Sequence, residues 1–115
     1  MQVTSLERCP ASVPQMAGAE GVTKQVPISA RDGSPSFSFR VFTVAPGGHT
    51  PLHSHPFEHL NYIISGKGML MDGGKGHPVK EGDFAMVLPG ESHQYRNASA
   101  DEPLVFICAV PKQYE

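Results

Sequence analysis

The sequence predicts an all-β protein, and three observations lead to that fold class. Twelve glycines and eleven prolines are spread over 115 residues, so no stretch without a helix breaker is long enough for a long helix. The prolines recur at intervals typical of short strands and turns. Apolar and polar residues alternate with a period of two, most clearly over residues 36–41. Eight or more short strands predict a closed barrel or a two-sheet jelly roll.

The first expected strands cover residues 23–30 and 36–45, joined by a turn at residues 31–35. In the second, Phe37 and Phe39 alternate with Ser38 and Arg40, which indicates one buried and one wetter face. A sharp turn at Pro46-Gly47-Gly48 should follow, and then a strand that carries histidines. Later strands are expected at residues 60–64, 69–71, 84–88, 93–96 and 104–110.

The length of the chain predicts one domain. Residues 1–22 are small, polar and aperiodic, so we expect an N-terminal arm there and a single barrel domain over residues 23–115. Cys9 and Cys108 do not make a disulfide framework.

Four of the six histidines form a pattern that predicts a metal site. His53 and His55 are two residues apart and project to one face of a strand, and His59 is an even number of places further on. His93 must come from a separate strand. Imidazoles that converge from two strands bind transition metals: Zn, Cu, Fe and Ni, and also Mn when geometry and supply favour it. His49 and His77 are expected to be bystanders.

Two motifs in this region resemble those of the cupin family. In the first, Gly47 is followed by His53-Ser54-His55, then His59 and Gly66. In the second, Gly82 and Pro89 precede His93 and Asn97, with a Pro-to-His interval one residue shorter than usual. The resemblance covers roughly residues 40–110. It implies a jelly-roll barrel, or double-stranded β-helix, and a metal ion held by the motif histidines.

One position departs from the usual cupin pattern. The family's third ligand is normally a glutamate, but here His59 has that spacing and Glu58 precedes it. The chain thus resembles the smaller subset of cupins in which four histidines, His53, His55, His59 and His93, hold the ion. A bulge in the strand could instead turn Glu58 inward.

Four neutral imidazoles leave the full charge of a divalent ion uncompensated, which favours an anionic or enolate ligand. They also supply no carboxylate base, whereas Lewis-acid and oxygen-activating chemistry stay available at open coordination positions. The predicted pocket wall is mostly apolar and suits a small hydrophobic or aromatic substrate. Its candidates are Phe39 or Phe42, Ile63, Met69, Met71, Phe84, Tyr95, Phe106 and Cys108.

Cys108 has two interpretations. It is either a small buried hydrophobe or a thiol close to the metal, and both faces of residues 104–110 are apolar, so periodicity does not choose between them.

Three functions fit these residues. The first is a small metal-dependent oxygenase or oxidative catalyst that acts on a small apolar or enolisable substrate. The second is a non-catalytic metal-binding or small-ligand sensor module, and the third, weaker because no acid–base pair is visible, is an isomerase or epimerase. A net charge of −2 without basic runs excludes nucleic acid as an expected partner.

The sequence contains no membrane-spanning run and no export leader, so we expect a cytoplasmic protein. We also expect a homodimer in which the arm or strand 23–30 joins the partner's sheet.

Overall fold

The computed structural model describes all residues, 1–115, and consists of strands with three short 3-10 turns. The 3-10 turns are Leu6–Arg8, Ala30–Asp32 and Lys112–Tyr114. The strands are β1 (Glu20–Ile28), β2 (Phe37–His49), β3 (His59–Ser65), β4 (Lys67–Met71), β5 (Gly76–Lys80), β6 (Phe84–Val87), β7 (Gln94–Arg96) and β8 (Leu104–Pro111). No helix is long and apolar enough to cross a membrane.

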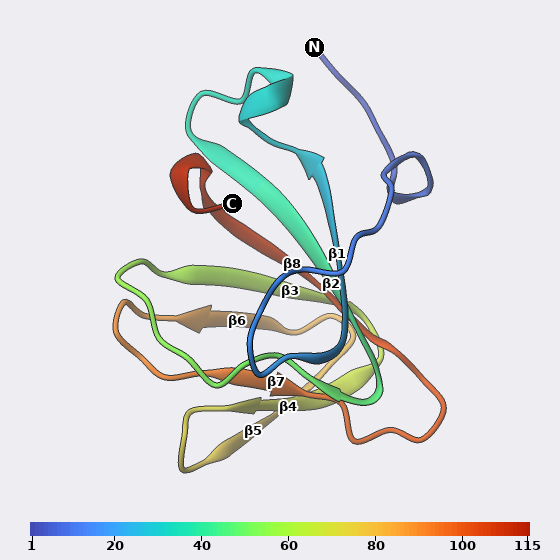
Figure 1. Ribbon diagram of the computed structural model, residues 1–115, viewed down its shortest axis with the longest axis vertical. Helices are drawn as coiled ribbons and strands as arrows, with labels where there is room; N and C mark the ends of the chain where they lie inside the picture. The colour runs from blue at the N-terminus through green and yellow to red at the C-terminus, as the bar shows by residue number, and fades with distance from the viewer.

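The strands form one antiparallel sheet that curls around its own interior (Figure 1). Its order is β5-β4-β7-β2-β8-β3-β6, and β1 pairs with β2 outside this path. The sheet therefore ends at β5 and β6, which leave a seam between them. The predicted all-β jelly-roll fold is confirmed.

β2 and β8 form the longest ladder, from Phe37↔Pro111 to Val44↔Leu104. Along β8, Leu104, Phe106, Cys108 and Val110 are all buried and alternate with half-buried residues. The face that sequence periodicity left open is therefore assigned, and Cys108 points into the barrel.

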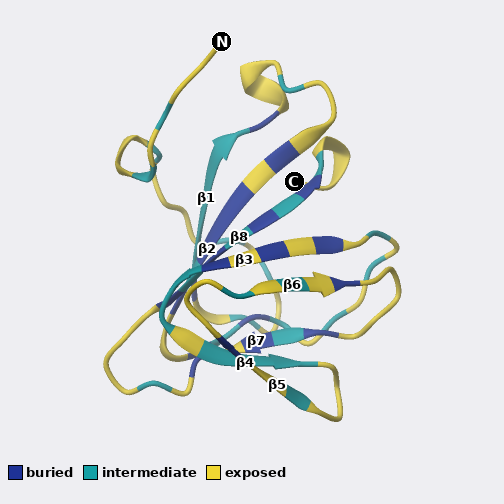
Figure 2. Cartoon of the chain, turned by 180° about the vertical axis from the view of Figure 1, so that it is seen from behind, coloured by how far each residue is buried: buried dark blue, intermediate teal, exposed yellow.

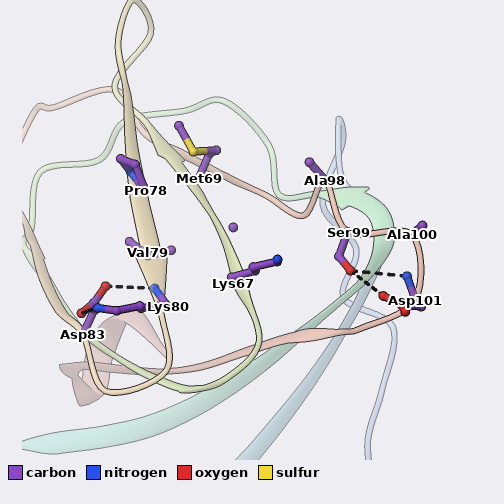
Figure 3. Close-up of a pocket in the computed structure, with 11 residues that line it drawn as sticks. Lys67, Met69, Pro78, Val79, Lys80, Asp83, Ala98, Ser99, Ala100 and Asp101 are labelled. Atoms are coloured by element: carbon purple, nitrogen blue, oxygen red, sulfur yellow. Dashed lines mark hydrogen bonds and ion pairs between the residues drawn. The ribbon is translucent and has the colours of Figure 1, made fainter.

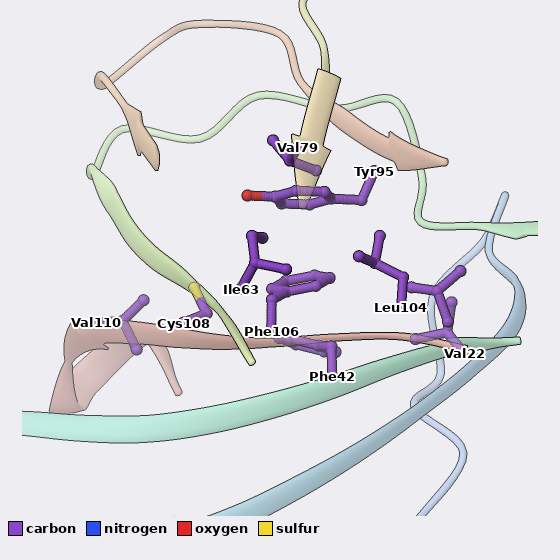
Figure 4. Close-up of a cluster of buried hydrophobic side chains, with 10 residues drawn as sticks. Val22, Phe42, Ile63, Val79, Tyr95, Leu104, Phe106, Cys108 and Val110 are labelled. Carbon is purple, nitrogen blue, oxygen red and sulfur yellow. The ribbon is translucent and has the colours of Figure 1, made fainter. Parts of the chain in front are cut away.

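The buried core lies within the curl of the sheet (Figure 4). Phe106 is at its centre, with its ring centroid 4.1 Å from that of Tyr95 and 5.6 Å from that of Phe42. Ile63 and Leu104 are fully buried beside these rings. Aromatic stacking of this kind adds to the stabilisation that comes from burial alone.

The expected orientation of the first half of β2 is wrong. Phe37 and Phe39 are 64% and 46% exposed, whereas Ser38 and Arg40 are 1% and 9% exposed. The polar residues of this alternation therefore face the barrel interior. The period-two alternation is present in β2, but it does not indicate which face of the strand is buried when the interior is itself polar.

The segment that carries the first histidines is also not a regular strand. β2 runs through Pro46 to His49, because Gly47 adopts φ +76° and its N–H bonds to the carbonyl oxygen of Asn97. Residues 50–58 then form a loop. A backbone hydrogen bond from Thr50 to Tyr95 and an isolated bridge between His53 and His93 hold this loop against the sheet. The histidines converge through this loop and not through strand parity.

The N-terminal arm packs on the free side of β1. Ser12 forms a two-way backbone bridge with Lys24, at 2.8 and 2.9 Å. The side-chain amide of Gln25 donates to the carbonyl oxygens of Leu6 and Cys9 at 3.0 and 2.8 Å. The arm thus covers part of the β1 edge within its own chain.

The outer face of β2, β3 and β6 carries exposed apolar side chains. Figure 2 shows the exposed positions along these strands in yellow. Phe84 is 81% exposed and Leu60 51%, and both lie beside Phe39 and Tyr62 around a shallow hollow. Exposed apolar patches of this kind often mark protein interfaces. The homodimer stays a prediction, and this face offers a surface for it that the sequence did not indicate.

We expect Phe84→Lys to shift the protein toward the monomer, since a buried lysine without a partner is costly at an apolar interface. Light scattering at micromolar concentration measures the mass. Lys67→Glu, on the exposed end of β4, is the control and should leave the mass unchanged. A wild-type monomer at the same concentration would contradict the prediction.

Candidate metal centre

Three histidines place ligand nitrogens at one point inside the barrel. Nitrogen atoms of His53, His55 and His93 all lie within 4.8 Å of one another. The backbones of His53 and His93 exchange two hydrogen bonds, of 3.2 and 2.9 Å, and this bridge fixes the loop to the start of β7. The structure therefore joins the two histidine motifs that are separated in the sequence.

Backbone carbonyl groups set the tautomer of each of these rings. The Nδ1–H groups of His53, His55 and His93 donate to the carbonyl oxygens of Pro51, Phe57 and Glu91, each at 3.0 Å. The lone pair is then on Nε2. The Nε2 atoms of His55 and His93 are buried without any hydrogen-bond partner. Unpartnered, convergent Nε2 lone pairs fit a divalent transition metal, and metal-binding histidines are usually held in this manner.

His59 is next to this cluster but is not part of it. Its ring centroid is 4.2 Å from that of His55 and 5.1 Å from that of His93. Its Nε2 accepts a hydrogen bond from Arg40 Nη2 at 3.2 Å, since a guanidinium can only donate. Glu58 is exposed and points away from the interior. His59 as fourth ligand therefore stays a prediction, and Arg40 holds the atom that would bind the ion.

Burial favours the neutral imidazole form of His55, His59 and His93. It lowers the pKa of His55 and His93, and the neighbouring histidines lower both further. The pKa of His59 falls to about 2, first because of burial and then because of the Arg40 charge. Neutral imidazole is the form that binds metal, so acid should weaken binding only at a lower pH than the ordinary histidine pKa of about 6.5 implies.

We expect the metal-free protein to lose stability as the pH falls below about 6.5. The pKa values of His55, His59 and His93 are lower in the folded than in the unfolded state, so the unfolded chain takes up protons first. Each histidine can change the free energy of unfolding by at most about 1.4 kcal/mol per pH unit. For His59 the loss continues toward pH 2, its folded pKa.

Urea unfolding at pH 7.5 and 5.5 measures this effect, with His77→Gln as a control because His77 is exposed. Equal stability at the two pH values would contradict the burial of neutral imidazoles.

A small internal cavity of about 50 Å³ adjoins the histidines. Tyr95, Phe106 and Cys108 line it, whereas Ile63 belongs to the core and does not. Tyr95 donates its hydroxyl proton to Asn61 Oδ1 at 3.1 Å, and burial raises the pKa of Tyr95. Of the alternatives Phe39 and Phe42, Phe42 lines this cavity, and Phe39 is exposed on the outer face of the sheet. Phe84 is also exposed, and it lines the cleft between β5 and β6.

Arg40 is the cavity residue that sequence reasoning missed. Its alternation with Phe39 was visible, but a charged residue in that pattern is usually on the solvated face. Its nearness to a histidine motif in the fold could not be read from one sequence. The Arg40 guanidinium makes this cavity more polar than the predicted wall.

A larger cleft of about 390 Å³ leads to the histidines from the seam between β5 and β6. Met71 and Val87 line it, and His93 lies at its end. A third hollow, of about 760 Å³, lies away from the histidines (Figure 3). Lys67, Asp83 and Asp101 line that hollow, and it contains no histidine or cysteine. We therefore assign the chemistry to the internal cavity and the seam.

Two aromatic rings cover His55 on its outer side. The ring of Phe57 stacks on His55 at 4.0 Å between centroids, with 8° between the planes. Tyr114, from the last 3-10 turn, stacks on Phe57 at 4.0 Å and 9°. This stack, Tyr114–Phe57–His55, links the C-terminal turn to the metal centre.

The other motif residues have structural roles. Asn97 is buried, and its amide donates to the carbonyl oxygens of Val44 and Glu102 at 3.0 and 2.8 Å.

His77 pairs with Asp72 at 3.1 Å on the exposed β4–β5 hairpin, and His49 lies 3.6 Å from a Glu20 carboxylate oxygen. Both histidines lie outside the cluster.

Comparison with known proteins places these features in one family. The model of the Cupin domain family matches residues 40–110. An oxalate-binding protein of Thermotoga maritima is 29% identical over 113 residues, which cover 96% of this chain and 93% of that protein. The 1-methylthio-D-xylulose 5-phosphate methylsulfurylase of Rhodospirillum rubrum is 40% identical over 90 residues, 77% of this chain. The match covers 55% of that protein, so this chain spans about half its length.

A solved structure shows the same architecture. The polyketide cyclase RemF from Streptomyces resistomycificus superposes with a TM-score of 0.90 at 27% identity. The superposition covers 96% of this chain and 79% of that one.

Proposed function

This chain belongs to the cupin family, and from that premise we propose that it is a small metal-dependent catalyst that acts on an enolisable substrate with oxygen donors. The observation that carries the proposal is the convergence of ring nitrogens of His53, His55 and His93, whose Nδ1–H groups are held by carbonyl oxygens, together with the buried, unpartnered Nε2 atoms of His55 and His93. Such a set is costly to bury without a ligand, and a divalent ion satisfies it.

We propose that His53, His55 and His93 bind the ion and that His59 joins them when Arg40 releases it. The 4.2 Å between the His55 and His59 rings supports this, because a small rotation of one side chain brings its nitrogen to the cluster. Imidazole ligands suit Mn, Fe, Cu, Ni or Zn. An ion that takes six ligands would keep open coordination positions with four imidazoles, which is the arrangement of catalytic and not structural sites.

When bound, such an ion supplies Lewis-acid polarisation of an oxygen ligand and activation of dioxygen. The side chains around the site would position the substrate and exclude water. Phe106 and Tyr95 exclude water from the inner wall, and the Tyr95 hydroxyl is held by Asn61, so it stays protonated as a hydrogen-bonding group. The small inner cavity admits the functional end of a substrate, and the seam accommodates the remainder.

An oxygen electrode tests the oxidative activity. The protein is loaded with Mn(II), Fe(II) or Cu(II) and offered 1,3-diketones, 2-oxo acids and arylalkenes. We expect oxygen consumption with at least one pair of metal and substrate, lost in His93→Ala. Metal content of protein from unsupplemented cells, measured by plasma mass spectrometry, identifies the native ion. No oxygen uptake with any pair would refute the oxidative function.

A second function, small-ligand binding without catalysis, has an observation of its own. No carboxylate lines the internal cavity, so a general base for proton abstraction is missing. The relative named as an oxalate-binding protein covers nearly the whole chain. Calorimetric titration of the metal-loaded protein with oxalate distinguishes the two: saturable binding without turnover supports a binding module, and turnover supports an enzyme.

A further inference from the structure

The internal cavity contains one permanently charged side chain, Arg40. It lies in the middle of β2, opposite Cys108 of β8, and is 9% exposed. Arginine cannot lose its charge in a protein, so this cation is buried at every accessible pH. A buried charge normally has an acidic partner. No Asp or Glu lies within ion-pair distance of Arg40.

The partners of Arg40 are weak ones. Its Nη2 donates to Cys108 Sγ at 2.9 Å and to His59 Nε2 at 3.2 Å, both on neutral groups. Burial raises the pKa of the Cys108 thiol, so the sulfur is not a stable anion. The guanidinium carbon lies 5.2 Å from the centroid of Phe42. The buried Nε–H of Arg40 has no hydrogen-bond partner at all.

These contacts leave the positive charge of Arg40 without an acidic partner, and Arg40 helps to line the cavity. The lining residues include three histidines and no acid, so nothing in the cavity neutralises Arg40. A divalent ion bound to His53, His55 and His93 would bring further positive charge close to Arg40. The low dielectric of the interior strengthens the demand for an anion.

We propose that Arg40 is an anion subsite that binds a carboxylate group of a small substrate, with the carboxylate between Arg40 and the metal centre. The planar fork of a guanidinium matches two carboxylate oxygens. The cavity, of about 50 Å³, is large enough to admit a carboxylate group beside Arg40. This proposal extends the proposed function, and it depends on that function only for the presence of the metal centre.

The same geometry gives Arg40 a second effect. Because Nη2 holds His59 Nε2, a carboxylate that draws the guanidinium away frees His59. Carboxylate binding and the completion of a four-histidine site are then coupled. Removal of the guanidinium should likewise free His59, so Arg40 variants should change metal affinity and carboxylate affinity in opposite directions.

The experiment uses metal-free protein first, so that it does not depend on the metal centre. Acetate and malonate are titrated while ¹H–¹⁵N spectra follow the Arg40 Nε–H signal, which is assigned by its loss in Arg40→Lys. We expect a saturable downfield shift of that signal. Inorganic phosphate is the comparison anion, and a shift with phosphate but not with carboxylates would overturn the carboxylate assignment, as would no shift with any of them.

Arg40→Met then separates binding from folding. We expect carboxylate affinity, measured by calorimetry, to fall at least tenfold, and Zn(II) affinity, measured with a chromogenic chelator, to rise severalfold. A purely structural role for Arg40 would lower both, and that result would overturn the proposal. Arg40→Lys keeps the charge without the fork and should lie between wild type and Arg40→Met for carboxylate. Equal carboxylate affinity in all three proteins would also overturn it.

Arg96→Met is the matched control, because it removes the guanidinium of an exposed arginine that does not line the cavity. It should retain carboxylate binding within about threefold. Loss of Zn(II) binding in His55→Ala is a separate test. If His55→Ala binds Zn(II) as wild type does, the metal proposal fails while the carboxylate result still decides the role of Arg40.

Discussion

His93→Ala is expected to weaken Zn(II) binding by roughly 100-fold or more, because it removes one of the three histidine ligands that converge in the cavity. Competition with a chromogenic chelator gives the affinity, and plasma mass spectrometry gives the stoichiometry. His77→Ala is the matched control, since that ring is exposed and pairs with Asp72. An unchanged affinity in His93→Ala would contradict the metal centre.

His59→Ala decides between three and four ligands. If His59 joins the ion on loading, its loss should weaken binding nearly as much as the loss of His93. If the Arg40 contact persists in the loaded protein, the affinity of His59→Ala should stay within a few-fold of wild type, and the four-histidine prediction would then be wrong.

Phe106→Ala should lower the free energy of unfolding by about 3–5 kcal/mol. The ring is 3% exposed and contacts both Tyr95 and Phe42, so its removal leaves a cavity at the centre of the barrel. Urea unfolding followed by circular dichroism measures the change. For a domain of this size that loss is a large fraction of total stability.

Phe37→Ala makes the same chemical change at a position that is 64% exposed, and it should stay within about 0.5 kcal/mol of wild type. Equal losses at the two positions would contradict the inward assignment of the even-numbered face of β8.

Turn residues and period-two alternation were sufficient to predict the all-β class and most strands within a few residues. The ladder β8 is an example, expected at residues 104–110 and found at Leu104–Pro111. Residues 72–78, around His77, have a turn-like composition, but residues 76–78 belong to edge strand β5. Proline is tolerated on an edge, where its missing N–H faces no neighbour.

The histidines of the candidate site were also recognisable from sequence, although for a partly mistaken reason. His53 and His55 converge because a loop is bound to His93, not because a strand alternates. The spacing of the histidines in the motif reflects the length of that loop, and the same spacing also agrees with strand parity. Arg40 could not be found in this way, because its importance depends on a β2–β8 register that brings residues 68 positions apart into contact.

The stack of Tyr114, Phe57 and His55 has a practical consequence for how this protein can be observed. The chain contains no tryptophan and three tyrosines, so its intrinsic ultraviolet emission comes from tyrosine alone. One of these emitters is separated from a metal-site imidazole by a single phenyl ring. A paramagnetic ion such as Cu(II) in the centre should quench that emission, and Tyr114→Phe should remove the quenched fraction. The native chain thus carries its own optical reporter of site occupancy, with no label required.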